Sequence, residues 1–62
     1  MMIIKCLIVD DEPLARQMLA EHLQAVPDFE LVGECKNALE LQSALESQPV
    51  DLIFLDLSLI HI

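Results

Sequence analysis

Residues 3–16 read Ile-Ile-Lys-Cys-Leu-Ile-Val-Asp-Asp-Glu-Pro-Leu-Ala-Arg, an apolar run joined to a helical one by three acids. The run Ile3–Val9 is apolar except for Lys5 and rich in β-branched residues, which is typical of a strand covered on both faces of a parallel sheet. The acids Asp10–Glu12 end this run, and Pro13 suits the first position of a helix. The segment therefore predicts a buried strand followed directly by a helix.

Apolar spacing extends this helix and then changes to a second strand. Residues at intervals of three and four predict one amphipathic helix. They are Leu14, Ala15, Met18, Leu19, Leu23 and Val26. Pro27 forces the residue before it away from helical geometry, so the helix ends there. Phe29–Cys35 then has the pattern of a strand, and its polar members indicate an edge position.

A second helix and a third strand follow. Asn37 and Glu40 have the spacing of a capping box, with Asn in place of the usual Ser or Thr. The apolar stripe of the helix comprises Ala38, Leu41, Ala44 and Leu45. Val50–Leu55 is nearly continuous in apolar character, as the first strand is, and it leads into Asp56. The order strand, helix, strand, helix, strand predicts a right-handed βαβαβ unit of the α/β class.

Three aspartates are expected at one edge of this parallel sheet. Asp10 and Asp11 lie just past the carboxyl end of the first strand, and Asp56 lies just past that of the third. If the third strand pairs beside the first, the strand order is 2-1-3, the helices cover opposite faces and the carboxylates converge. Order 1-2-3 would hold them further apart. The apolar first and third strands favour order 2-1-3.

Clustered carboxylates predict a metal and phosphoryl site. Three of them cannot all stay ionised cheaply, so the site either retains a proton or binds a hard divalent cation. Mg²⁺ fits because one or two carboxylates, water and a phosphoryl oxygen satisfy it, and an Asp carboxylate can accept a phosphoryl group. On this interpretation Asp10 and Asp11 hold the metal and Asp56 is the acceptor. Alternatively, the first acids only complement the positive end of the helix and Asp56 is a turn residue.

Composition limits the partners of the chain. Its 62 residues include eleven Asp and Glu against three Lys and Arg, a net charge of -8. This charge repels phosphate backbones and anionic headgroups, so we expect no direct binding to nucleic acid and none to membranes. The apolar runs are too short for a membrane span, and the first residues lack the pattern of a signal peptide. A cytoplasmic location is therefore expected.

The two cysteines are expected to remain reduced. Cys6 lies within the first predicted strand and Cys35 ends the second. In parallel register they are offset by several residues, beyond the ~7 Å between Cα atoms that a disulfide tolerates. The sequence therefore predicts two buried thiols rather than a bridge.

Two segments resemble the receiver domain of bacterial two-component response regulators. They are Ile-Val-Asp-Asp-Glu-Pro-Leu-Ala-Arg at 8–16 and Val-Asp-Leu-Ile-Phe-Leu-Asp at 50–56. The Asp-Asp-Glu-Pro-Leu-Ala-Arg form is similar in particular to receivers of the LytTR type. The resemblance covers about residues 3–57 and implies a flavodoxin-like receiver fold truncated to βαβαβ, with a parallel sheet of order 2-1-3. Residues 1–62 are thus expected to form a partial receiver domain, in which residues 58–62 depart from the family.

The resemblance also implies a role for each acid. Asp56 would be the phospho-acceptor and a metal ligand, Asp11 a direct Mg²⁺ ligand, and Asp10 an acid acting mainly through metal-bound water. The backbone carbonyl of Ser58 would be a further ligand. The phosphodonor would be a sensor histidine kinase, and a LytTR-type parent protein would carry a DNA-binding output domain downstream. Such a receiver is a signalling module rather than an enzyme.

Departures from the family keep two alternatives open. Where receivers usually have a Met-Pro pair and a Gly-containing loop, the chain has Leu-Ile-His-Ile at 59–62, and the family's Ser or Thr on a fourth strand and Lys on a fifth have no counterpart in it. The first alternative is an inert truncated fragment, whose β-prone Val50–Ile62 lies at an uncovered edge. The second is a Mg²⁺-dependent phosphatase with an aspartyl nucleophile, although Asp-x-Asp would be expected where the chain has Asp10–Glu12.

Overall fold

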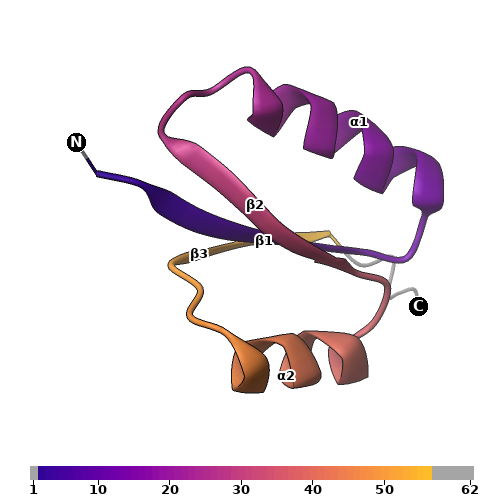
Figure 1. Cartoon of the computed structure of the whole chain (residues 1–62). Coiled ribbons are helices and arrows are strands. Elements are labelled where there is room, and N and C mark those ends of the chain that lie inside the picture. The colour runs from indigo at the N-terminus through magenta and orange to yellow at the C-terminus, as the bar shows by residue number, and fades with distance from the viewer. Residues whose placement is uncertain (1, 57–62) are drawn as a thin grey trace.

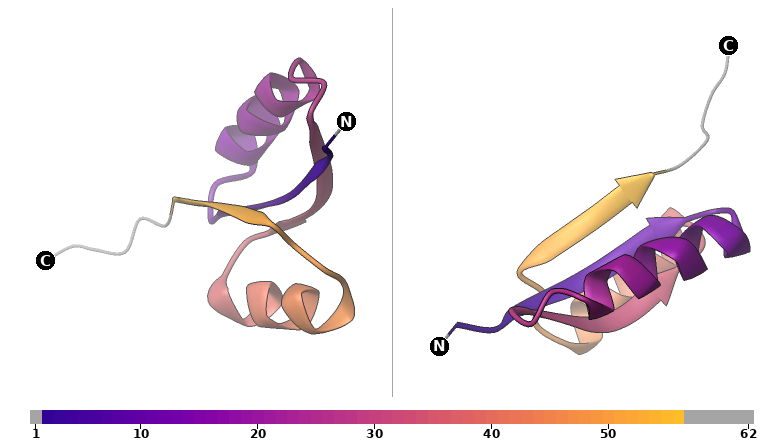
Figure 2. Two further views of the ribbon diagram at one scale, coloured as in Figure 1. Left: turned by 90° about the vertical axis from the view of Figure 1, so that its left-hand side faces the viewer. Right: turned by 90° about the horizontal axis from the view of Figure 1, so that it is seen from above.

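The computed structural model describes residues 2–56, which form a parallel three-stranded sheet between two helices (Figure 1). In chain order the elements are β1 (Ile4–Asp10), α1 (Pro13–Gln24), β2 (Phe29–Cys35), α2 (Ala38–Ser47) and β3 (Leu52–Asp56). The strand order is β2-β1-β3, and β1 pairs in parallel with both neighbours. The helices lie on opposite faces of the sheet, as Figures 1 and 2 show. The predicted α/β class and strand order 2-1-3 are confirmed.

Strand β1 forms the centre of the core, because its alternate residues face the two helical layers. The layer under α1 contains the buried residues Cys6, Ile8, Ala20 and Leu23, and the layer over α2 contains Leu7, Val9 and Cys35. The four consecutive residues Cys6–Val9 have no exposed surface. A strand buried on both faces was predicted for this run, and the structure confirms it. Both cysteines are buried and free, on opposite faces of the sheet, as expected.

The helices begin where the sequence predicts. Pro13 is the first residue of α1, and α2 begins at Ala38 after Asn37. The Asn37 side chain accepts a hydrogen bond from the Glu40 backbone N–H at 2.8 Å, while the Glu40 carboxylate accepts one from the Lys36 N–H at 2.9 Å. This reciprocal arrangement satisfies backbone donors that the start of a helix leaves free. Within residues 2–56, no helix is long and apolar enough to cross a membrane.

Strand boundaries differ from the predicted ones at both acidic ends. Strand β1 continues through Asp10 instead of ending at Val9, and β3 runs from Leu52 to Asp56 instead of from 50 to 55. The backbone N–H of Asp51 donates to the Lys5 carbonyl at 2.8 Å, and the Asp51 carboxylate accepts from the Lys5 N–H at 2.9 Å. These bonds fix how β3 enters beside β1, and the register that follows pairs Asp10 with Asp56.

Replacing Asp51 by alanine should loosen this entry. The Asp51→Ala change removes a charged acceptor from the Lys5 N–H. Loss of such a hydrogen bond usually lowers the free energy of unfolding by about 1–2 kcal/mol. Because this bond is exposed to water, we expect a loss at the lower end of that range. The Asp51→Asn change keeps an acceptor oxygen and should lose less. Urea denaturation of a folded receiver carrying each variant measures both effects. Equal stability of the alanine variant and the parent would show that this bond does not secure the register.

Strand β2 contains a register shift that decides which face two of its residues take. Cys6 pairs with Leu31, but the next residue, Leu7, pairs with Gly33, so one extra residue lies in β2. Such a bulge reverses the alternation beyond it. A Cβ on Gly33 would lie 3.0 Å from the buried Leu7 side chain, which explains the small residue there. As a result Glu34 is opposite Ile8, on the α1 side of the sheet.

Strand β3 is apolar like β1 but has a different environment. In the described part of the chain it pairs with β1 alone, and Leu52, Ile53 and Leu55 are 36% to 62% exposed. Its Phe54 packs edge-on against Phe29, with ring centroids 6.1 Å apart. The apolar pattern predicts that β3 is covered on both faces, as β1 is. Within residues 2–56, however, β3 is only partly covered.

Candidate acidic site at the carboxyl edge of the sheet

Two of the three predicted site residues are cross-strand partners. Asp10 is the last residue of β1, Asp56 is the last residue of β3, and the two are paired in register. Neighbouring strands lie ~4.8 Å apart, so the two backbones meet at the carboxyl edge of the sheet. Asp11 follows directly in the turn to α1. The topology therefore brings all three aspartates to one edge.

Asp10 is the buried member of the three. Only 5% of its surface is exposed, and its Oδ1 accepts a hydrogen bond from the Glu12 backbone N–H at 2.9 Å. Arg16 does not pair with this carboxylate, because its Nη1 donates to the backbone carbonyl of Asp10 at 2.6 Å and its Nε lies 3.7 Å from Glu34 Oε1. Buried charges are usually paired or bound to a metal. The carboxylate of Asp10 is thus a suitable anion for a cation at this edge.

Asp11 and Asp56 are exposed to solvent. A carboxylate that must meet water, a hydrated ion or a phosphodonor has to be accessible, and both of these are. The site thus combines one buried acid held by the turn with two that are open to ligands. The roles of these residues in metal binding and phosphoryl acceptance stay predictions.

The three aspartates fit Mg²⁺, which keeps bound water, better than a metal ion that is enclosed by protein ligands alone. Among residues 2–56, no three His, Cys, Asp or Glu side chains are grouped so as to enclose a metal ion. Mg²⁺ rarely needs such a group, because it keeps several waters and takes only one or two carboxylates. Asp11 and Asp56 could bind it, with Asp10 holding a metal-bound water. Ser58, whose carbonyl was predicted as a ligand, lies outside the described residues.

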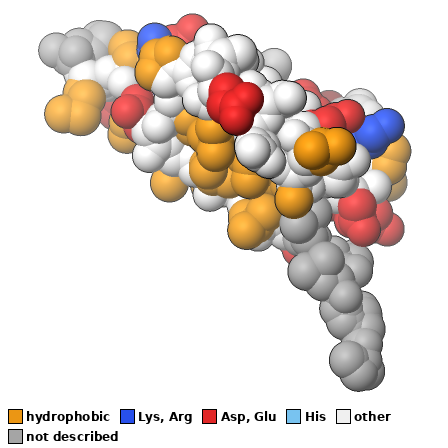
Figure 3. All heavy atoms as spheres, turned by 90° about the horizontal axis from the view of Figure 1, so that it is seen from below, with side chains coloured by type: hydrophobic (Ala, Val, Ile, Leu, Met, Phe, Trp, Pro, Cys, Tyr) orange, Lys and Arg blue, Asp and Glu red, His pale blue; other side chains and the backbone are white. Residues whose placement is uncertain are grey.

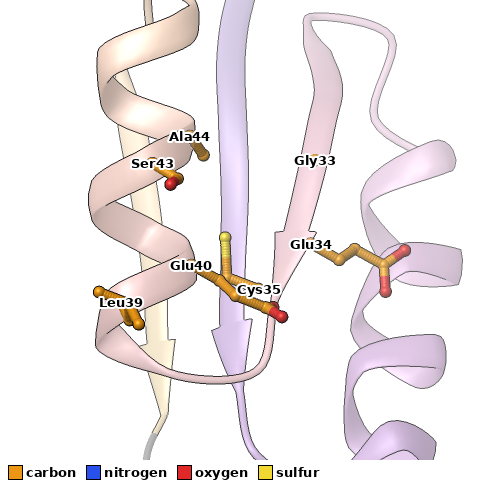
Figure 4. Close-up of a pocket in the computed structure, with 7 residues that line it drawn as sticks. All are labelled: Gly33, Glu34, Cys35, Leu39, Glu40, Ser43 and Ala44. Carbon is orange, nitrogen blue, oxygen red and sulfur yellow. The ribbon is translucent and has the colours of Figure 1, made fainter.

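An open groove lies on the other face of the sheet, between β2 and α2 (Figure 4). It has a volume of about 400 Å³ and is lined by Gly33, Glu34, Cys35, Leu39, Glu40, Ser43 and Ala44. Burial raises the pKa of the Cys35 thiol above its ordinary value, and the nearby Glu40 carboxylate adds to the effect. The Glu34 side chain points away from the groove toward α1 (Figure 4). None of the three aspartates lines this groove.

The surface on the α2 side is mixed rather than basic. Hydrophobic side chains gather there between acidic ones, and few basic side chains are visible (Figure 3). Leu39 and Leu45 of α2 are 75% and 45% exposed. The described residues therefore give this face a mixed apolar and acidic surface.

Comparison with known protein families matches residues 6–62 to the response regulator receiver domain. The chain belongs to the response regulator receiver family. This confirms the resemblance seen in the two aspartate-containing segments, and it favours a receiver over a phosphatase with an aspartyl nucleophile. The chain is a receiver of a two-component response regulator, a signalling module of a kind that is generally not an enzyme.

Curated relatives of this receiver are described as regulatory proteins. The transcriptional regulatory protein BtsR of Escherichia coli K12 is 52% identical over 56 residues, which cover 90% of this chain and 23% of BtsR. The transcriptional regulatory protein LytR of Staphylococcus aureus N315 is 46% identical over 55 residues, covering 89% and 22%. An uncharacterized response regulatory protein of Shewanella oneidensis is 43% identical, covering 90% and 24%. The receiver chain thus spans less than a quarter of the length of these relatives. No solved structure gives a significant match.

The role of Glu34 in this receiver could not be predicted from the sequence. Glu34 was placed on an edge strand by its polarity alone, which says nothing about the face it takes. The register shift in β2 turns it toward α1, where it meets Arg16. A glycine directly before it was the one available signal, since glycine within a strand often marks a bulge.

Proposed function

We propose that Asp56 accepts a phosphoryl group in the presence of Mg²⁺, which Asp10, Asp11 and Asp56 hold together with water and the Ser58 carbonyl. The observation that carries this proposal is the in-register pairing of Asp10 with Asp56 beside Asp11. It supports a site in which acceptor and metal-binding carboxylates share one edge. Residues 3–57 are proposed to be the first part of the receiver domain, with residues 58–62 departing from the family pattern.

The proposed reaction is a direct phosphoryl transfer. A carboxylate oxygen of Asp56 forms the new bond to phosphorus while the bond from phosphorus to the donor's imidazole nitrogen breaks, and the imidazole leaves with the bonding electron pair. When bound, Mg²⁺ neutralises charge on the phosphoryl oxygens. Asp10, which is buried and fixed by the turn, would hold a metal-bound water, and the exposed Asp56 is open to the donor.

The proposed donor is a sensor histidine kinase, and the proposed readout is an output domain that binds DNA. BtsR and LytR are both described as transcriptional regulatory proteins, which supports an output of this kind. A net charge of -8 supports a receiver that acts through such a domain and does not contact nucleic acid itself. The proposed location is the cytoplasm, where ATP provides the phosphoryl group to the kinase.

The test uses a complete receiver that contains this site. In a chimera, residues 1–56 replace the matching segment of Escherichia coli BtsR, which is 52% identical. We expect acetyl phosphate and Mg²⁺ to label the chimera with an acid-stable, base-labile phosphoryl group, and we expect chelation of Mg²⁺ to prevent labelling. A folded chimera that takes no label under conditions that label BtsR would contradict the proposal.

A second candidate is that the 62-residue polypeptide is inert on its own. The observation that favours it is β3, whose outer edge is unpaired in the described part and whose Leu52, Ile53 and Leu55 are exposed. An acceptor on such a strand lacks the rigid support that phosphoryl transfer requires. Labelling of the polypeptide beside the chimera distinguishes the two candidates.

A further inference from the structure

We propose that Arg16 is a positioning residue of the acidic site, which fixes the turn carrying Asp10 and Asp11, and that Glu34 keeps the charge of Arg16 away from their carboxylates. The inference rests on the proposed function, because it concerns how the same site holds Mg²⁺. It is carried by two contacts of one guanidinium group, one to the backbone of the turn and one to a neighbouring strand.

The first contact anchors the turn. Arg16 Nη1 donates to the Asp10 carbonyl at 2.6 Å, a short bond from a charged donor. The backbone N–H of Arg16 also donates to the Glu12 carbonyl at 3.1 Å, the first bond of α1. Asp10 Oδ1 in turn accepts from the Glu12 N–H. Both ends of the three-residue turn 10–12 are therefore tied to Arg16, and the exposed Asp11 lies between them.

The second contact directs the charge. Arg16 Nε lies 3.7 Å from Glu34 Oε1, and the side chains are 19% and 41% exposed. The Glu34 carboxylate points toward α1 (Figure 4), so it draws the guanidinium toward β2. A free guanidinium on this helix turn would compete with a cation for the carboxylates of Asp10 and Asp11. Glu34 thus lets Arg16 bind the backbone of the turn without neutralising its acids.

Charge and positioning predict opposite effects of removing Arg16. By charge alone, the loss of a cation beside an acidic site should strengthen Mg²⁺ binding. By positioning, the turn loses its anchor and Mg²⁺ binding should weaken, as it usually does by about 10-fold or more when a group that orients a metal ligand is removed. The sign of the change therefore separates the two explanations.

The experiment compares four variants of the BtsR chimera by calorimetric Mg²⁺ titration and by amide hydrogen exchange without metal. Arg16→Ala should weaken Mg²⁺ binding by about 10-fold and accelerate exchange of the Glu12 amide, while the buried Ile8 amide exchanges as before. Arg16→Lys, which keeps the charge without the two-partner geometry, should also weaken binding. Glu34→Gln should weaken binding while Glu12 stays protected. The control Lys36→Ala removes a cation whose side chain forms no hydrogen bond or ion pair with turn residues 10–12, so binding should not weaken.

The outcomes separate this inference from the proposed function. If Arg16→Ala binds Mg²⁺ as well as or better than the parent, or if it accelerates exchange of Ile8 as much as that of Glu12, Arg16 is not a positioning residue. Binding by Arg16→Lys equal to that of the parent would show that a single ammonium donor is sufficient and that the two-partner geometry of the guanidinium is not needed, which also overturns the inference. If the parent chimera binds no Mg²⁺ and takes no label, the proposed function fails, while the metal-free exchange of Glu12 still decides whether Arg16 anchors the turn.

Discussion

Asp56→Asn in the BtsR chimera is expected to lower phosphoryl labelling by about 100-fold or more, to background. The carboxylate is the nucleophile in the proposed transfer, and an uncharged amide has neither the charge nor the reactive oxygen to replace it. The substitution keeps the size and shape of the side chain at an exposed position at the end of β3, so the fold should not change. The measurement is incorporation of labelled phosphate from acetyl phosphate with Mg²⁺.

A matched control tests whether the acceptor is specific. Asp51→Asn makes the same chemical change just before β3, at the end of the strand opposite Asp56, and it keeps an oxygen for the Lys5 N–H. This variant should be labelled as the parent is. Hydroxylamine should release the label from both, because it cleaves acyl phosphates. Label that persists in the Asp56→Asn chimera would move the acceptor to another residue, with Asp10 and Asp11 the first to test.

The backbone of the site could be predicted from the sequence because few local signals conflict. The apolar run from Ile3 to Val9 fits a strand buried on both faces, and Pro13 fits the first helical position. The polar residues of β2 then favour an edge for that strand, which leaves β1 in the centre. Strand order 2-1-3 follows, and with it the meeting of Asp10 and Asp56 at one edge.

Contacts that depend on the register of the strands could not be predicted from the sequence. The bulge in β2 places Glu34 on the α1 side, and the preceding Gly33 is the one local signal of that bulge. The bonds between Lys5 and Asp51 lie at the start of β3, and the register of β1 with β3 continues from there to the pair Asp10 and Asp56, although an acidic residue normally signals the end of a strand. Tertiary hydrogen bonds decided these positions. The hydrogen bonds around Asp10 are therefore known only from the structure. The position of Asp10 at the edge of the sheet, in contrast, could be predicted from the sequence.

The 62-residue polypeptide alone is expected to show no cooperative thermal transition as a monomer and to take no label. Among the described residues seven hydrophobic side chains are buried, whereas ten large ones keep at least 36% of their surface exposed. A body of this size buries only about 60% of its unfolded surface even when compact, so little free energy of folding remains. The exposed edge of β3 adds a site for pairing between chains. Circular dichroism during heating, with sedimentation to detect aggregates, measures the outcome.

Thiol reactivity provides a second, independent measurement on the same polypeptide. In the folded chain burial raises the pKa of Cys6 and Cys35, and the charges of Asp51 and Glu40 add to it, so the reactive thiolates are disfavoured and shielded. Both thiols should therefore react slowly at pH 8 if the fold is populated. We expect them to react instead at the rate of free cysteine, with no acceleration by urea. Slow reaction together with a cooperative transition would show that residues 1–62 fold alone. In that case the absence of label would have to be attributed to groups missing from the site, since loss of the fold could no longer explain it.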